Sequence, residues 1–175
     1  NVTNMSGAYS NCRNLTGSPV CGDNVISMNY AYENCTSLTG APVCGPNVTN
    51  MKYTYVGCSK LTGPPVCGPN VTNMYQTYYS CKNLSSNGYF YSNEVTNVYG
   101  CFAVRDINKR LNLYVPANNT TLTTCLSNSS STSLTGAKIT WTNDMSTNGC
   151  YYNTAVNIYI YPVANVEQAY KDNEK

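Results

Sequence analysis

Cysteine is the residue type most able to do chemistry in this chain, which carries ten cysteines and no histidine. Without histidine the sequence lacks the commonest general base and the usual partner of a nucleophilic serine or cysteine. Its eight carboxylates are scattered, and no pair has a spacing that indicates acid–base catalysis. The sequence also has no glycine-rich phosphate loop. We therefore expect no catalytic site, no cofactor and no enzyme activity.

The spacing of the cysteines distinguishes a metal site from disulfides and from a buried core. Metal sites favour pairs separated by two to four residues, and no such pair occurs, so we expect no metal. A regular 23-residue spacing instead favours two inward columns of free thiols that act as small apolar side chains. Disulfides within one repeat, such as Cys35–Cys44, are the alternative, and Cys125–Cys150 is a further candidate pair. The two columns are Cys12, Cys35, Cys58 and Cys81, and Cys21, Cys44 and Cys67.

The same 23-residue period governs the whole first half of the sequence. The opening motif Asn-Val-Thr-Asn-Met returns, with small changes, at 24–28, 47–51 and 70–74. In each repeat a Tyr follows the Met by four residues, a Cys follows the Tyr by three, and a Leu follows the Cys by three. One such coil cannot bury its apolar face alone, whereas stacked coils merge these positions into continuous columns. The methionine column is Met5, Met28, Met51 and Met74.

Two short elements are expected in each coil, as the second and third repeats illustrate. Residues 38–44 indicate a brief strand, which Pro42 interrupts because proline has no ladder donor. Residues 48–58 carry apolar side chains at a three-to-four spacing, which predicts a short helix or 3₁₀ segment. Asn47 is placed to cap that segment.

Beyond Cys81 the repeat pattern decays, and Glu94 displaces the next copy of the motif by one position. Alternating apolar residues predict strands at 111–116, 138–142 and 155–161, with a loop at 118–135 and a short helix at 166–171. We expect a repeat array over 1–84, truncated at its N-terminus, followed over 85–175 by a degenerate coil and a β-rich capping domain. The predicted fold class is a β-rich, leucine-rich-repeat-like solenoid with a short strand and a short helical segment per coil, plus a small β-rich C-terminal cap.

The order Cys-x-x-Leu-Thr, Val-Thr-Asn-Met, an aromatic residue and Cys resembles the BspA-like leucine-rich repeats. The match covers residues 1 to 84 and returns four times in register. The sequence departs from the family in carrying Tyr where Phe is usual, and Pro-Val-Cys where a more aliphatic strand is usual. The resemblance implies a surface-exposed adhesion module of the kind found in bacteria and some parasites, with Tyr- and Asn-rich versions in phage tail-fibre-like proteins.

Tyrosine is the most unusual feature of the composition, with seventeen Tyr against two Phe and one Trp. Charged residues make up 10% of the chain, against about 25% in an ordinary soluble domain. Tyrosine offers rigid contact area with a polar tip, which suits recognition surfaces. The net charge of +2 without a basic stripe excludes a nucleic-acid partner, and no apolar stretch is long enough for a membrane span.

Residues that vary between otherwise similar coils form the candidate contact surface. They flank the Met and the Cys of each coil, where core packing does not restrict them. Grouped on one face, their tyrosines would make a stripe that resembles an antibody paratope in composition. The alternative is exposed filler without a binding role. The candidates are Tyr30, Tyr53, Tyr75, Tyr79, Lys52 and Arg13.

Several Asn-x-Ser/Thr sequons occur, at Asn1, Asn14, Asn47, Asn70 and Asn119 among others. They indicate either N-glycosylation or the copying of one repeat motif, and we favour copying because many of these Asn occupy turn or column positions.

The sequence thus predicts an extracellular, cell-surface or virion-surface recognition module that binds a cell-surface protein or glycan. The distal part of a phage tail fibre is the first context that we consider. The alternative is a structural repeat module, a spacer or a unit that assembles into a homo-oligomeric fibre.

Overall fold

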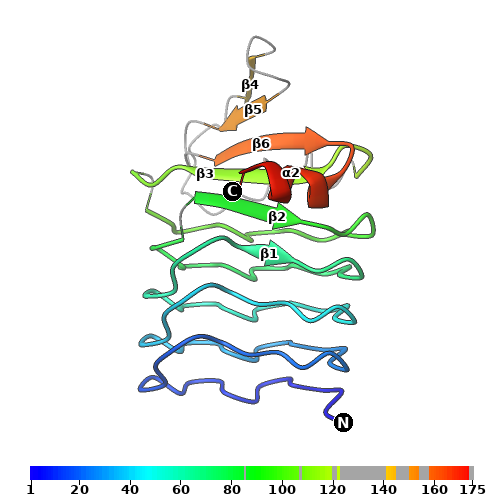
Figure 1. The fold of residues 1–175 in the computed structure, drawn as a ribbon. Helices are drawn as coiled ribbons and strands as arrows, with labels where there is room; N and C mark the ends of the chain where they lie inside the picture. Colours follow the sequence, from blue (N-terminus) through cyan, green and yellow to red (C-terminus); the bar gives the residue numbers. More distant parts are fainter. Residues whose placement is uncertain are drawn as a thin grey trace.

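In this computed structural model, residues 1–84, 86–106, 108–119, 122, 141–144, 150–153 and 158–173 are described. Regular secondary structure in these residues gathers at the C-terminal end in a six-stranded sheet of order β1-β2-β3-β6-β5-β4, with one helix beside it (Figure 1). Four neighbouring strands pair in parallel: β1 (Val66–Cys67), β2 (Ser86–Phe90), β3 (Leu111–Pro116) and β6 (Ile158–Val163). Two further strands continue the sheet antiparallel: β5 (Cys150–Asn153) and β4 (Trp141–Asp144).

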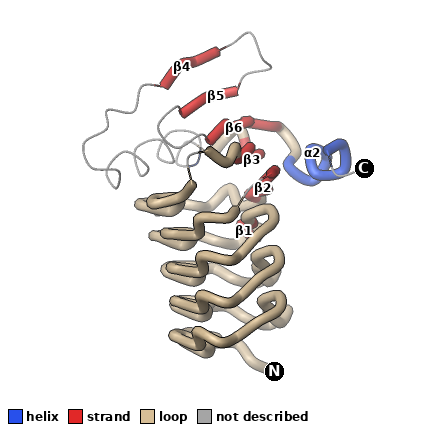
Figure 2. Tube along the Cα trace, turned by 90° about the vertical axis from the view of Figure 1, so that its left-hand side faces the viewer, coloured by secondary structure: helices blue, strands red, loops and turns tan. Residues whose placement is uncertain are grey.

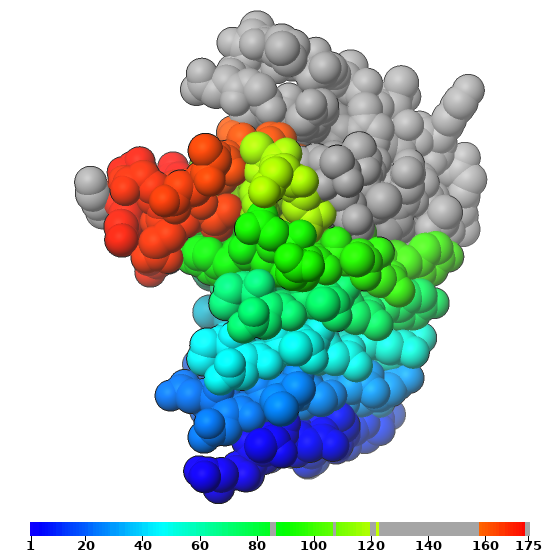
Figure 3. Space-filling model, turned by 90° about the vertical axis from the view of Figure 1, so that its right-hand side faces the viewer, coloured from blue at the N-terminus to red at the C-terminus, as the bar shows by residue number. Residues whose placement is uncertain are grey.

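The predicted fold class, a leucine-rich-repeat-like solenoid with a strand and a helical segment in each coil plus a β-rich cap, is wrong. The regular elements form instead a small sheet with four parallel strands and one short helix. Residues 1–65 contain only turns, bends and isolated bridges. These turns are nevertheless stacked at the period of the sequence, because single parallel bridges join Asn4, Ser27, Asn50, Asn73 and Asn97 in succession (Figure 2). Figure 3 shows the coils as successive bands of colour.

The helical segment predicted over 48–58 does not form, because its amides bond in two alternating ways. Met51, Tyr53 and Tyr55 donate their N–H groups to carbonyls of the next coil. Thr54 and Cys58 instead donate to the residue three positions earlier. An α-helix needs successive amides to bond four residues back and a 3₁₀ helix three back, so with alternate amides bonded to the next coil neither forms and the three-to-four spacing belongs to a chain of turns. Asn47 accordingly caps no helix.

The strand predicted over 38–44 is also missing, and the backbone of Val43 bonds to a side chain. Its N–H donates to the hydroxyl of Tyr55 at 3.0 Å, and its carbonyl accepts from that hydroxyl at 2.7 Å. Both groups that a sheet ladder would use are therefore bonded to a side chain of the next coil. In the third repeat Tyr78 binds Val66 in the same way, yet β1 forms there because Tyr89 and Tyr91 donate their N–H groups to the carbonyls of Pro65 and Cys67.

Stacking the coils builds one continuous core of equivalent residues. The methionine column is buried throughout, from Met5 at 8% exposure to Met28, Met51 and Met74 at 0%. A second column consists of rings stacked face to face, with centroids between 5.1 and 5.6 Å apart. This inner aromatic column comprises Tyr9, Tyr32, Tyr55, Tyr78 and Phe102.

Two predictions for the C-terminal half, a strand and a helix, are confirmed. The strand predicted at 111–116 is β3, whose Leu111, Leu113 and Val115 are buried in alternation. The helix predicted at 166–171 is part of α2 (Val166–Asn173), which contacts β2 and β3. The strands predicted at 138–142 and 155–161 overlap β4 and β6, while their remaining residues and most of 118–135 lie outside the described residues.

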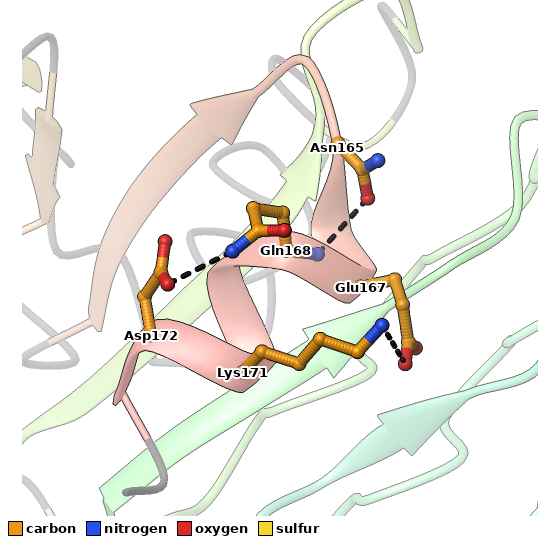
Figure 4. A network of polar contacts seen from close by, with 5 residues as sticks. All are labelled: Asn165, Glu167, Gln168, Lys171 and Asp172. Atoms are coloured by element: carbon orange, nitrogen blue, oxygen red, sulfur yellow. Dashed lines mark hydrogen bonds and ion pairs between the residues drawn. The ribbon is translucent and has the colours of Figure 1, made fainter.

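Helix α2 begins at a side-chain cap and is held by two pairs on its surface (Figure 4). The Oδ1 atom of Asn165 accepts the N–H of Gln168 at 3.0 Å, as an N-cap residue does. Gln168 donates to Asp172 at 2.9 Å, and Lys171 pairs with Glu167 at 3.5 Å. Among the described residues, no helix has the length and apolarity that crossing a membrane requires.

Candidate recognition surface

Four tyrosines from successive coils make a continuous row of rings. Tyr30 stacks on Tyr53 with centroids 4.7 Å apart, and Tyr75 stacks on Tyr99 at 5.3 Å. The two pairs meet edge to face, where Tyr53 and Tyr75 are 5.2 Å apart at an interplanar angle of 74°. Such geometries are favourable for aromatic pairs. We call Tyr30, Tyr53, Tyr75 and Tyr99 the tyrosine stripe.

A lysine lies at the junction of the two pairs. The Nζ atom of Lys52 is 5.3 Å from the ring centroid of Tyr53 and 5.6 Å from that of Tyr75. Both distances fall within the range of a cation–π interaction. Desolvation, with a smaller contribution from the neighbouring Tyr75 hydroxyl, raises the pKa of Tyr53. The centre of the stripe therefore combines ring edges, neutral hydroxyls and one ammonium group.

Two tyrosines of the stripe have a backbone conformation that L-residues rarely adopt. The φ angle is 57° at both Tyr30 and Tyr53. The equivalent position carries Gly7 in the first coil, Gln76 in the fourth and Gly100 in the fifth, with φ of 68°, 49° and 62°. A left-handed residue other than glycine costs on the order of 1–2 kcal/mol. Glycine would satisfy the backbone at these positions without strain, so the backbone conformation does not account for the two tyrosine side chains there.

The structure brings together four of the six predicted contact residues. Tyr30, Tyr53, Tyr75 and Lys52 touch one another in the stripe. Tyr79 makes no ring contact with them; its backbone carbonyl accepts the N–H of Gly57. Arg13 is exposed, and its carbonyl accepts the Thr36 hydroxyl at 3.5 Å. Neither residue is joined to the stripe by a contact within the described part of the chain.

Sequence reasoning missed Tyr99, which is 43% exposed at the C-terminal end of the stripe. The signal was available in the displacement at Glu94, which shifts the motif by one residue. With that shift Val98 takes the place of Met74, and Tyr99 takes the place of Tyr75. The amide of Gln76 confirms the register, because it donates to the carbonyl of Tyr99 at 2.8 Å.

The predicted cysteine columns are present, and their described thiols are free. Cys35, Cys58, Cys81 and Cys67 are buried, Cys21 and Cys44 are half-buried, and Cys12 is exposed in the first coil. In the first column the thiol donates to the tyrosine carbonyl of the preceding coil, as from Cys58 to Tyr32 at 3.0 Å. Burial raises the pKa of the Cys44 and Cys58 thiols to about 12. The thiolate, which is the nucleophile, is therefore disfavoured.

Three cysteines lie outside these columns in the sequence. Cys101 is buried beside the inner aromatic column, and its carbonyl accepts the amide of Tyr78 at 2.9 Å. Cys125, one half of the candidate bridge with Cys150, lies outside the described residues. Among the described residues, no group of three or more His, Cys, Asp or Glu side chains converges as metal ligands would.

The sequons occupy two kinds of site. Asn119 is 5% exposed, and its amide nitrogen donates to the carbonyls of Ser92 and Val95, so a glycan has no room there. Asn47 and Asn70 are exposed, and each donates one amide hydrogen at 2.8 Å to a carbonyl of the preceding coil. These two side chains hold neighbouring coils together, which is the structural role expected of a copied motif.

Comparison of this chain with protein-family models, curated proteins and solved structures finds no match.

Proposed function

We propose that this chain is a non-catalytic recognition module exposed on the outside of a cell or virion, and that it binds its partner through the tyrosine stripe. One observation carries the proposal: Tyr30 and Tyr53 place stacked rings on a left-handed backbone position where the first and fifth coils have glycine and the fourth has Gln76. Strain of this kind is often found at binding sites, where the side chain is needed for contact. Tyrosine rings held rigidly by stacking also lose little conformational entropy on binding.

The ring geometry favours a protein partner over a glycan at the stripe. Sugars stack on an open aromatic face. In each stacked pair of the stripe, one face of each ring is already covered by the partner ring. Tyr53 and Tyr75 meet edge to face, and the ammonium group of Lys52 lies near both rings. The stripe therefore offers ring edges, hydroxyls and an ammonium group, which suit the mixed polar and apolar surface of a protein.

The resemblance to BspA-like repeats supports the same proposal, because members of that family are adhesion modules of cell surfaces. A phage tail fibre is the context in which a Tyr- and Asn-rich version would have its distal end against a host. In either setting the stacked coils supply both length and contact area.

Binding of the labelled chain to a panel of intact bacterial cells, alongside a glycan array, tests the proposal. Tyr30→Gly with Tyr53→Gly removes both rings while satisfying the left-handed backbone, so the variant should fold and lose binding. Tyr9→Phe, a change in the inner aromatic column and not in the stripe, should leave binding unchanged. Protease treatment of the cells should abolish binding if the partner is a protein. Undiminished binding of the folded double-glycine variant would reject the stripe as the contact surface.

Exposed apolar side chains in the first coil favour a second candidate function, a structural unit that assembles end to end. Val2 and Val20 are 63% and 62% exposed there. They line a cavity of about 500 Å³ together with the core residues Met5 and Val25. Electron microscopy separates the two candidates, because regular filaments of the purified chain alone would favour assembly and dispersed particles would favour recognition.

A further inference from the structure

A second surface, distinct in its residues from the tyrosine stripe, consists of a shallow groove along the stacked coils. Its volume is about 620 Å³. Equivalent positions of successive coils line it in two rows, one of asparagines and one of threonines interrupted by Ile26. The parallel bridges at Ser27, Asn50 and Asn73 lie next to these rows and hold the coils in register. The lining residues are Asn1, Asn24, Asn47 and Asn70, with Thr3, Ile26 and Thr49.

Hydrogen bonds between coils fix the direction of the polar groups in this groove. The amide nitrogen of Asn47 donates to the carbonyl of Asp23, and that of Asn70 donates to the carbonyl of Pro46, both at 2.8 Å. The hydroxyl of Thr49 donates to the carbonyl of Ile26 at 3.3 Å. Each anchored amide retains its oxygen and a second N–H for a ligand, and the threonine retains acceptor capacity on its oxygen. These groups need no rearrangement before a ligand binds, which lowers the entropic cost of binding.

The lining also restricts the chemistry of the ligand. It contains no charged side chain, so it favours neither an anionic nor a cationic ligand. It contains no aromatic or arginine anchor of the kind that dominates protein interfaces. Ile26, 50% exposed, adds an apolar side chain to the threonine row. A neutral molecule with many hydroxyls and with C–H faces satisfies all three conditions.

The periodicity of the groove indicates a ligand that is itself a chain. Neighbouring parallel strands are about 4.8 Å apart, so the bridged coils repeat the same pair of polar groups at about that interval. A single sugar would contact one or two coils, whereas an extended oligosaccharide would contact the whole row. We propose that this groove binds a linear neutral oligosaccharide along the coil axis, independently of the partner of the tyrosine stripe.

Titration of the chain with three neutral hexasaccharides, cellohexaose, xylohexaose and N-acetylated chitohexaose, tests this proposal by isothermal calorimetry. At least one should bind at millimolar concentration or below, and its disaccharide should bind about tenfold more weakly because it spans fewer coils. Heparin, a sulfated polysaccharide, should not bind because the groove has no cation. Failure of all three hexasaccharides to bind, or tighter binding of heparin, would overturn the proposal.

A matched pair of substitutions at one position locates the binding. Ile26→Thr restores the residue type of the neighbouring coils and should keep affinity within about twofold. Ile26→Glu places a charge in the neutral groove and should weaken binding by about tenfold. Tyr30→Gly with Tyr53→Gly should leave oligosaccharide binding intact, which separates this groove from the stripe.

Nuclear magnetic resonance of the unmodified chain gives an independent readout, should Ile26→Glu fail to fold. Addition of the binding hexasaccharide should shift the methyl signals of Ile26 and Thr49 while those near Tyr99 stay in place. Shifts confined to the tyrosine stripe would contradict the proposed site.

Discussion

The hydroxyl of Tyr55 donates to the carbonyl of Val43 at 2.7 Å and accepts the N–H of the same valine at 3.0 Å. Tyr32 and Tyr78 make the same pair of bonds with Val20 and Val66. Each of these three tyrosines therefore binds both backbone groups of one valine. This relationship gives the hydroxyl at these positions a structural role, because a phenyl ring could make neither bond.

Replacement of Tyr55 with Phe should destabilise the protein by about 1–3 kcal/mol. The stacked ring would remain, but the N–H and carbonyl of Val43 would lose their partner inside the molecule. Urea unfolding followed by circular dichroism would measure the change. Tyr9→Phe is the control, since Tyr9 stacks on Tyr32 but its hydroxyl bonds no valine among the described residues. Equal losses in the two variants would show that the hydroxyl bonds do not matter.

The effect of a Tyr53 substitution on stability should depend on whether the new residue tolerates a left-handed backbone. Tyr53→Gly relieves strain of about 1–2 kcal/mol while losing stacking of about 0.5–1.5 kcal/mol, so its stability should change little. Tyr53→Ala loses the stacking and keeps the strain, so it should be less stable than the glycine variant by about 1 kcal/mol. Thermal unfolding would rank the two variants, and an alanine variant as stable as the glycine variant would contradict the strain.

Addition of one methyl group at Gly45 should be poorly tolerated. A Cβ there would lie 2.9 Å from the sulfur of Cys21 and 2.9 Å from the carbonyl oxygen of Gly22. Gly45→Ala should therefore cost about 1–3 kcal/mol through overpacking. Gly22→Ala is the matched control in the preceding coil, where the nearest atom is a methyl of Val25 at 3.8 Å. The difference between their unfolding midpoints in urea reports the destabilisation caused by the close contact between neighbouring coils at Gly45.

Stability should fall at alkaline pH, partly because of Cys58. Burial raises the pKa of its thiol from 9.0 in the reference state to about 12 in the folded protein. Below pH 9 both states keep the proton, so the contribution is fully present. Between pH 9 and 12 the unfolded chain loses the proton first, and the thiol removes about 1.4 kcal/mol of stability per pH unit.

Comparison of the protein with its Cys58→Ala variant from pH 8 to pH 11 tests this linkage. The variant is less stable at pH 8, but its free energy of unfolding should decline less steeply with pH. In the folded protein Cys58 should also resist alkylation by iodoacetamide, whereas the exposed Cys12 should react. Parallel pH profiles for the two proteins would contradict the role of Cys58.

The sequence alone determined the register of this protein, because identical residues recurring at a fixed interval must stack to be buried. The methionine column, the inner tyrosines and the cysteine columns could be predicted from that interval. Outside the repeats, strict alternation of apolar residues predicted β3, and the sequence from residue 166 to 171 predicted part of α2. The pairing of Tyr30 with Tyr53 also followed, since both occupy one position of the repeat.

The secondary structure of the coils was decided only by the tertiary structure. The spacing of Val48, Met51, Tyr55 and Cys58 fits a helix as well as a series of turns, and only bonds to the next coil distinguish the two. Those bonds direct alternate amides out of the coil, so no helix forms, and no strand pairs with residues 38–44 as β2 pairs with β1. Local periodicity indicates which side chains are buried, but it does not indicate which groups the backbone amides and carbonyls bond.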